Sequence, residues 1–120
     1  MAIASTAIGS TDTDILTVPA GKTYAVLTIM VCNTEPANPI HLEHGESQFD
    51  MHFIPNGGAK SNTNMVINDL ILPAGETFTF DSEKIILEEG DKVSFVAQPE
   101  NTNYGSGLTD LAVSLSYLEV

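Results

Sequence analysis

Apolar and polar residues alternate with a period of two along much of this sequence. Near its end, Leu111, Val113, Leu115 and Tyr117 would share one face of an extended chain, with small or hydroxyl-bearing residues between them. The segments ETFTFD and KVSFVA alternate in the same way, and no window carries a helical stripe longer than two turns. A period of two with β-branched and aromatic enrichment is typical of β-strands. The pattern therefore predicts an all-β protein.

Turn-forming residues separate these runs at short intervals. Pro-Ala-Gly occurs twice, at 19–21 and 73–75, and each copy is followed by a charged residue, Thr and an aromatic residue. Proline ends a strand and glycine adopts backbone conformations closed to most residues, so both copies predict strand–turn–strand corners. About eight strands are expected: 13–18, 22–33, 39–45, 48–54, 64–72, 76–87, 91–98 and 109–119. As an alternative, the strand 76–87 is broken at Asp81–Ser82.

A chain of 120 residues with this pattern is expected to form one domain, a β-sandwich over residues 13–120, with the jelly roll as the favoured topology. The run 24–32 is apolar on both faces, which predicts a central strand covered on both sides. Residues 1–12 are small and polar and predict a flexible N-terminal arm. An arm that orders on a neighbouring subunit through Ile3 and Ile8 is the alternative.

The charge of the chain limits its partners. It has 16 acidic residues, four lysines and no arginine, for a net charge of −12. Nucleic acids and anionic membranes would be repelled, because lysine and arginine supply the phosphate contacts of such interfaces. No apolar run approaches the ~18 residues of a membrane span, and the first residues lack a signal-peptide pattern. A single cysteine, Cys32, excludes an intramolecular disulfide. We expect a soluble protein that stays in the cytoplasm where it is made until it is used.

The densest cluster of ionisable side chains lies in the segment PIHLEHGESQFDMHF. His41, Glu43 and His44 are the candidate metal ligands, with His52 further along. A cupin-type site has the pattern His-x-His, in which one residue separates two histidines on the same face of a strand. His41 and His44 are separated by two residues and would fall on opposite faces. Solvated polar residues are the favoured interpretation. A carbohydrate-binding or cupin-like metal module is the competing one.

No catalytic pattern is visible in the sequence. Acidic neighbours such as Asp12 and Asp14 are expected by chance among so many acids, and no calcium-binding loop pattern surrounds them. There is no Gly-x-Ser-x-Gly motif, and Cys32 lies within a predicted strand without an adjacent base. We therefore predict a protein that is not an enzyme and that uses no cofactor.

One apolar segment is a candidate for the core or for an interface. In FDMHFIP, Phe49, Met51 and Phe53 share a face, and Ile54 leaves the strand near Asn56. The core is the favoured place for that face. An interface that includes Met51, Phe53, Ile54 and Asn56 is the alternative.

Three stretches carry a resemblance to a known group of proteins. TVPAGKTYAVLTIMVCNTE, LILPAGETFTFDSEKIILEEGDKVSFVA and LAVSLSYLEV resemble small virion structural proteins of tailed bacteriophages, especially those of marine and cyanobacterial hosts. The similarity covers about half of the chain, and its motifs specify turns rather than chemistry.

The resemblance implies a non-enzymatic jelly-roll or immunoglobulin-like sandwich, made in the bacterial host cytoplasm and present in several copies on the particle. The first expectation is a head decoration (cement) protein on the outer capsid surface. It would bind the major capsid protein as a homotrimer, stabilise contacts between capsomers, and require neither nucleic acid nor membrane. A tail, neck or fibre-associated protein is the second expectation.

Overall fold

The computed structural model describes residues 2–9, 11–35, 40, 46–81, 85–99 and 111–120. In this part of the chain all regular structure is β-strand, and no helix is present that could cross a membrane. Nine strands are formed: β1 Ala2–Ile8, β2 Thr13–Thr17, β3 Tyr24–Asn33, β4 Ser47–Ile54, β5 Met65–Leu72, β6 Thr77–Phe80, β7 Ile85–Leu87, β8 Lys92–Pro99 and β9 Leu111–Glu119.

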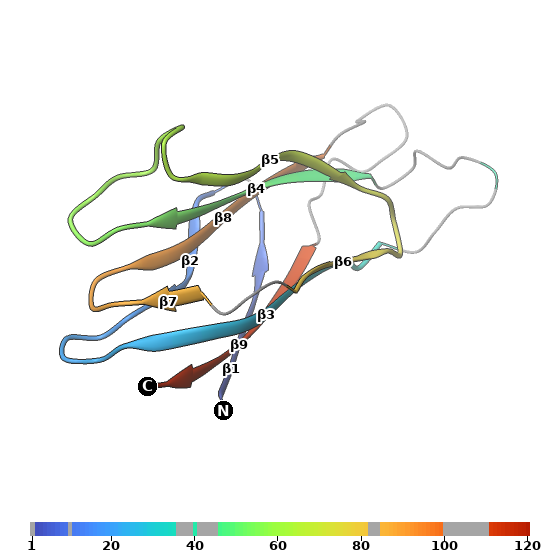
Figure 1. Ribbon diagram of the computed structural model, residues 1–120. Coiled ribbons are helices and arrows are strands. Elements are labelled where there is room, and N and C mark those ends of the chain that lie inside the picture. Colours follow the sequence, from blue (N-terminus) through green and yellow to red (C-terminus); the bar gives the residue numbers. More distant parts are fainter. Residues whose placement is uncertain (1, 10, 36–39, 41–45, 82–84, 100–110) are drawn as a thin grey trace.

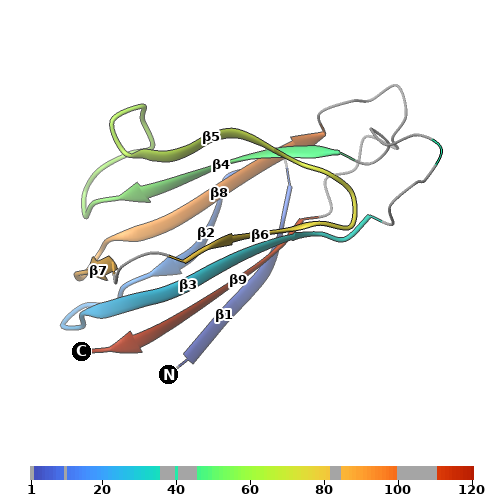
Figure 2. The ribbon, with the colours of Figure 1, turned by 45° about the vertical axis from the view of Figure 1, so that its right-hand side comes forward.

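The strands form two antiparallel sheets that pack face to face (Figures 1 and 2). The first sheet has the order β1-β9-β3, with β6 and β7 pairing with different parts of β3. The second sheet has the order β2-β8-β4-β5. The chain crosses between the sheets at every connection except β4–β5 and β6–β7. This is the strand order of a jelly roll, as the sequence predicted.

Most predicted strands are found. The predicted strand 76–87 is divided into β6 and β7, which both lie beside β3, and the alternative break at Asp81–Ser82 is confirmed at Asp81, which belongs to no strand. The predicted strand 39–45 lies outside the described residues except for Ile40, which is in a bend and exposed. The flexible arm expected over residues 1–12 is wrong for Ala2–Ile8, which forms β1 and pairs along its whole length with β9.

The core lies between the two sheets. It combines the inward side chains of β3 and β9 in the first sheet with those of β4 and β8 in the second. Its largest fully buried residues are Phe49, Phe95, Ile29, Met51, Leu111 and Leu115. The predicted two-sided burial of β3 is wrong, because Met30 on its outer side is 45% exposed. The apolar character of β3 is therefore only partly explained by the core.

Among the described residues, four turns of the same kind connect two strands or follow one. In each, the amide of the fourth residue donates to the carbonyl of the first, and the third residue is a glycine with φ between 77° and 83°. This is the pattern of a type II turn, which requires a positive φ at its third residue. The four turns are 19–22, 55–58, 73–76 and 88–91. Both Pro-Ala-Gly copies are among them, and both lead from the second sheet to the first.

Gly90 and Gly21 offer a matched pair of substitutions. Both have a positive φ, but a Cβ at Gly90 would clash with the side chain of Asn56, whereas nothing lies within 4 Å of a Cβ at Gly21. We expect Gly21→Ala to lower the free energy of unfolding by about 1 kcal/mol, from backbone strain alone. Gly90→Ala should cost about 2–3 kcal/mol because overpacking adds to that strain. Urea denaturation measures both, and equal losses would show that Asn56 moves aside without cost.

Candidate functional site

The three candidate metal ligands, His41, Glu43 and His44, lie outside the described residues. The structure therefore does not test whether these three side chains could bind one metal ion. Within the residues that are described, no group of three or more histidine, cysteine, aspartate and glutamate side chains is placed to hold a metal ion. The metal site stays a prediction.

His52, the third histidine of that segment, is buried in the second sheet. It lies in β4 opposite Ser94 of β8 and is 2% exposed. Its pKa is lowered, first by burial and then by the charge of Lys60, while the carboxylates of Asp50 and Asp12 act in the opposite direction. Lys60 and Asp12 form an ion pair of 2.7 Å between two loops. The neutral imidazole is therefore the form that the fold favours.

This burial predicts a dependence of stability on pH. A His52 pKa below its ordinary value of 6.5 means that the unfolded chain binds the proton more readily than the folded protein. Stability should therefore fall as the pH drops through that value. We expect this loss between about pH 7 and about pH 5 to be smaller in His52→Gln, which cannot be protonated. Urea denaturation at several pH values compares the two proteins, and parallel curves would contradict the prediction.

The predicted interface residues have different fates in the structure. The interface interpretation is wrong for Ile8 and Met51, which are at most 2% exposed, while Ile54 is 5% exposed but lines the surface pocket described below. Burial of Met51 and Phe49 confirms the favoured prediction that this face of β4 belongs to the core. Phe53 is half-buried and packs against the core, with its ring perpendicular to that of Phe80.

The other two predicted interface residues are on the surface. Ile3 is 69% exposed in β1. Asn56 is exposed in the turn 55–58, where its backbone amide donates to Oδ1 of Asp91 at 2.9 Å. Oδ2 of the same carboxylate accepts the amide of Glu88 at 2.9 Å. Asn56 therefore links two turns at one end of the sandwich.

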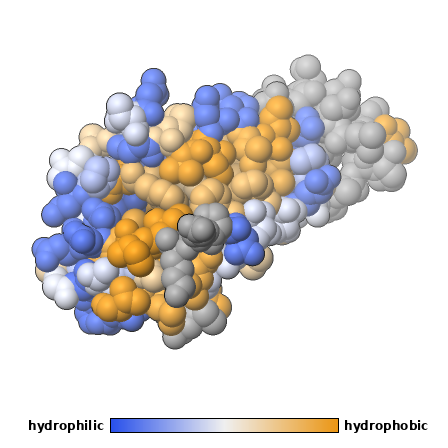
Figure 3. Space-filling model, viewed as in Figure 1, coloured by the Kyte–Doolittle hydropathy of each residue, from blue (hydrophilic) through white to orange (hydrophobic). Residues whose placement is uncertain are grey.

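An apolar pocket opens on the side of the sandwich where β5 and β7 form the edges of the two sheets. It has a volume of about 400 Å³, within the range of ligand-binding pockets. Its lining is largely apolar, and Asp91 is its one carboxylate: Phe53, Ile54, Pro55, Thr63, Asn64, Met65, Val66, Leu87 and Asp91. Figure 3 shows apolar residues across the middle of this side, with hydrophilic residues around them. Two other hollows, beside Asp69 and beside Ile3, are much smaller, with volumes of about 80 and 60 Å³.

A pair of carboxylates brought together by the fold was not visible in the sequence. The amide of Asp69 in β5 donates to Oδ1 of Asp50 in β4 at 2.7 Å, and Asp69 has a φ of 51° at an irregular step in the pairing of these strands. The Asp50 carboxylate raises the pKa of Asp69. The two residues are 19 positions apart, so no local motif indicates the pair. A pair of acids on neighbouring strands does not by itself define a site.

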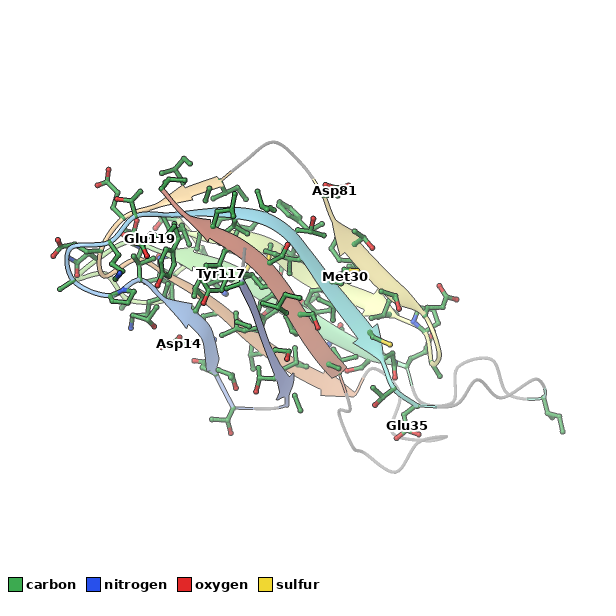
Figure 4. All side chains as sticks on the ribbon, turned by 90° about the horizontal axis from the view of Figure 1, so that it is seen from below. Asp14, Met30, Glu35, Asp81, Tyr117 and Glu119 are labelled. Atoms are coloured by element: carbon green, nitrogen blue, oxygen red, sulfur yellow. The ribbon has the colours of Figure 1, made fainter. Side chains whose placement is uncertain are left out.

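The first sheet is almost free of charge, which is unusual for so acidic a chain. Glu119 is the one charged residue within its five strands, and it forms an ion pair of 3.1 Å with Lys22. Each strand of the second sheet, by contrast, contains a charged residue. Figure 4 looks onto the first sheet: Met30 lies over β3, while Asp14, Glu35, Asp81 and Glu119 lie around the sheet. Its outer face also exposes Ile3 and Ile86. This uncharged surface was missed because the strands had not been assigned to sheets.

No family model matches this chain, and the search of curated proteins found no match.

Proposed function

We propose that this chain is a non-enzymatic structural protein of a bacteriophage particle, a head decoration (cement) protein. In this proposal it is made in the bacterial host cytoplasm and binds the outer surface of the capsid. Its partner is the major capsid protein, and its role is to stabilise contacts between capsomers. It uses no cofactor and contacts neither nucleic acid nor membrane.

The resemblance and the fold support the proposal together. The three stretches that resemble phage virion proteins include β3, β6 to β8 and β9, together with three of the four glycine turns. Jelly rolls occur in viral capsid proteins, lectins and cupins, so the strand order is compatible with a particle protein but is not specific to one. The choice among these functions depends on the surfaces that the scaffold presents.

The observation that carries the proposal is the apolar pocket between β5 and β7. Apolar side chains from the end of β4, the start of β5 and Leu87 surround it. Such a pocket suits an apolar side chain of another protein, because interface affinity depends mainly on a few anchors buried in pockets. Asp91 at this site and Glu88 beside it would favour a partner segment that also carries lysine or arginine.

Quantitative mass spectrometry of purified particles tests the proposal. Hundreds of copies per particle, in fixed proportion to the major capsid protein, would support head decoration. About a dozen copies would instead support the tail, neck or fibre role, because those structures have few subunits. Absence from particles would reject any virion role. Binding assays with metal ions and glycans, on variants of His41 and His44, would then test the metal and carbohydrate module.

A pair of variants connects particle binding to the pocket. Val66 and Ile71 both lie in β5 and are 39% and 47% exposed, but only Val66 lines the pocket. We expect particles that carry Val66→Glu to lose most of the protein during purification, and particles that carry Ile71→Glu to retain it. Equal retention of the two variants would show that the capsid binds another surface. Circular dichroism of the purified variants confirms that both are folded.

A further inference from the structure

Strand β1 is an unprotected edge of the first sheet. It pairs with β9 through seven consecutive residues without a register shift, and β9 is its only strand partner among the described residues. Its sequence, AIASTAI, contains no charge and no proline. An edge strand of this kind exposes unpaired backbone N–H and C=O groups that can pair with another strand.

The other edges of the sandwich are protected. β2 has five residues, an acidic side chain at Asp14 and a register shift beside it. β5 has two register shifts and the left-handed residue Asp69. The fourth edge is divided between β6 and β7, of four and three residues. Short strands, charges and bulges are the usual means by which proteins prevent edge pairing. Of the four edges, only β1 lacks all of these protective features. Its backbone groups are therefore available to pair with a partner strand.

We propose that two copies of this chain pair through β1, antiparallel and around a twofold axis at Ser5. The sequence of β1 is complementary to itself in this register. Ala2 would lie opposite Ile8 of the second copy, Ile3 opposite Ala7, and Ala4 opposite Thr6, so that each pair joins a larger side chain to a smaller one. The two Ser5 hydroxyls would meet at the axis, where they can form a hydrogen bond. The first sheets of both copies would become one continuous sheet.

The distribution of charge favours a second copy as the partner. Two chains that each carry a charge of −12 repel each other, and this repulsion is smallest where the contacting surfaces carry no acids. On the outer face, Ile3, Ser5 and Ala7 continue into Ser116, Ser114 and Ala112 of β9. The contact would contain no ion pairs. Added salt should therefore strengthen the pairing, because it screens only the repulsion between the two bodies.

This geometry differs from the homotrimer that the phage resemblance implies. A twofold contact uses the same strand of both copies, whereas a ring of three needs two different surfaces on each copy. The pairing also lies on the β1 edge, whereas the pocket lies between the β5 and β7 edges. It concerns the chain itself, so it holds or fails independently of the proposed particle role.

Sedimentation of the purified full chain over a concentration series tests the pairing. The expected mass rises from one chain of 12.8 kDa toward twice that value, and it does so at lower concentration in higher salt. Ser5→Lys places two like charges at the axis and should weaken the pairing roughly ten-fold or more. The control is Thr77→Lys, an exposed position on β6 at the opposite edge of the sheet, which should pair normally. A monomer at every concentration, a mass of three chains, or equal pairing of both variants would overturn the proposal.

Cross-linking provides a second test that does not depend on weakening the contact. In a Cys32→Ser background, Ser5→Cys should form a covalent dimer under mild oxidation, because facing Cβ atoms across an antiparallel pair are about 5 Å apart. Thr77→Cys in the same background should remain monomeric on a non-reducing gel. Equal cross-linking of the two variants, or none in Ser5→Cys, would overturn the twofold register.

Discussion

Replacing Phe49 with alanine is expected to lower the free energy of unfolding by about 3–5 kcal/mol. Phe49 is 1% exposed in β4 of the second sheet. Its ring lies 6.2 Å from that of Phe95 in the same sheet and 5.9 Å, edge-on, from that of Phe78 in the first sheet. Truncation removes buried apolar area and both ring contacts, and it leaves a cavity between the sheets. Urea denaturation monitored by circular dichroism measures the loss.

The matched control for Phe49 is Ile71 on the neighbouring strand. Ile71 is 47% exposed and pairs with Gln48, so Ile71→Ala removes an apolar side chain that is about half in water. We expect this variant to lose less than about 1 kcal/mol. If Phe49→Ala were as mild as the control, the two sheets would not depend on this contact, and the packing between β4 and β6 described above would be wrong.

Asn33→Leu should lower the free energy of unfolding by about 3 kcal/mol, although it preserves the size of the side chain. Asn33 is 1% exposed at the end of β3. Its Nδ2 donates to the carbonyl of Leu72 at 2.9 Å, and its Oδ1 accepts the amide of Glu35 at 3.0 Å. Leucine makes neither bond, so the buried carbonyl of Leu72 loses this donor. The strand β3 would then lose a connection to the second Pro-Ala-Gly turn.

Asn64 provides the control because it makes the same two kinds of hydrogen bond in an exposed loop. Its Nδ2 donates to the carbonyl of Ala59 at 2.9 Å, and its Oδ1 accepts the amide of Ser61 at 3.1 Å. Water can replace the bonds lost in Asn64→Leu, so we expect a loss of less than about 1 kcal/mol. Thermal and urea denaturation of both variants test this difference. Similar losses would show that the burial of Asn33 does not determine its importance.

The sequence was informative wherever a local pattern decides the structure. The alternation of Leu111, Val113 and Leu115 predicted β9, since all three face the core. Glycine at the third position of both Pro-Ala-Gly turns was expected to take an unusual backbone, and Gly21 and Gly75 have φ values of 77° and 79°. Turn geometry and strand alternation depend on neighbouring residues, which explains why they could be predicted.

Features that depend on distant residues were not predicted. Ala2–Ile8 has few large side chains, and it forms a strand because the edge of β9 supplies its hydrogen-bonding partners. His52 was expected in a solvated segment, yet it is buried in β4. The uncharged first sheet was present in the sequence as separate uncharged segments. It became visible only when the topology placed those segments side by side.

The pairing of β1 with β9 also determines the order in which the molecule can be completed during synthesis. A ribosome makes Ala2–Ile8 before any other strand described here, and it makes Leu111–Glu119 last. At about 5–20 residues per second, the strand β1 waits on the order of 5–20 s for its partner. Its own free edge is formed only when β9 arrives. Contacts that use this edge are therefore made only after Leu111–Glu119 has been synthesised.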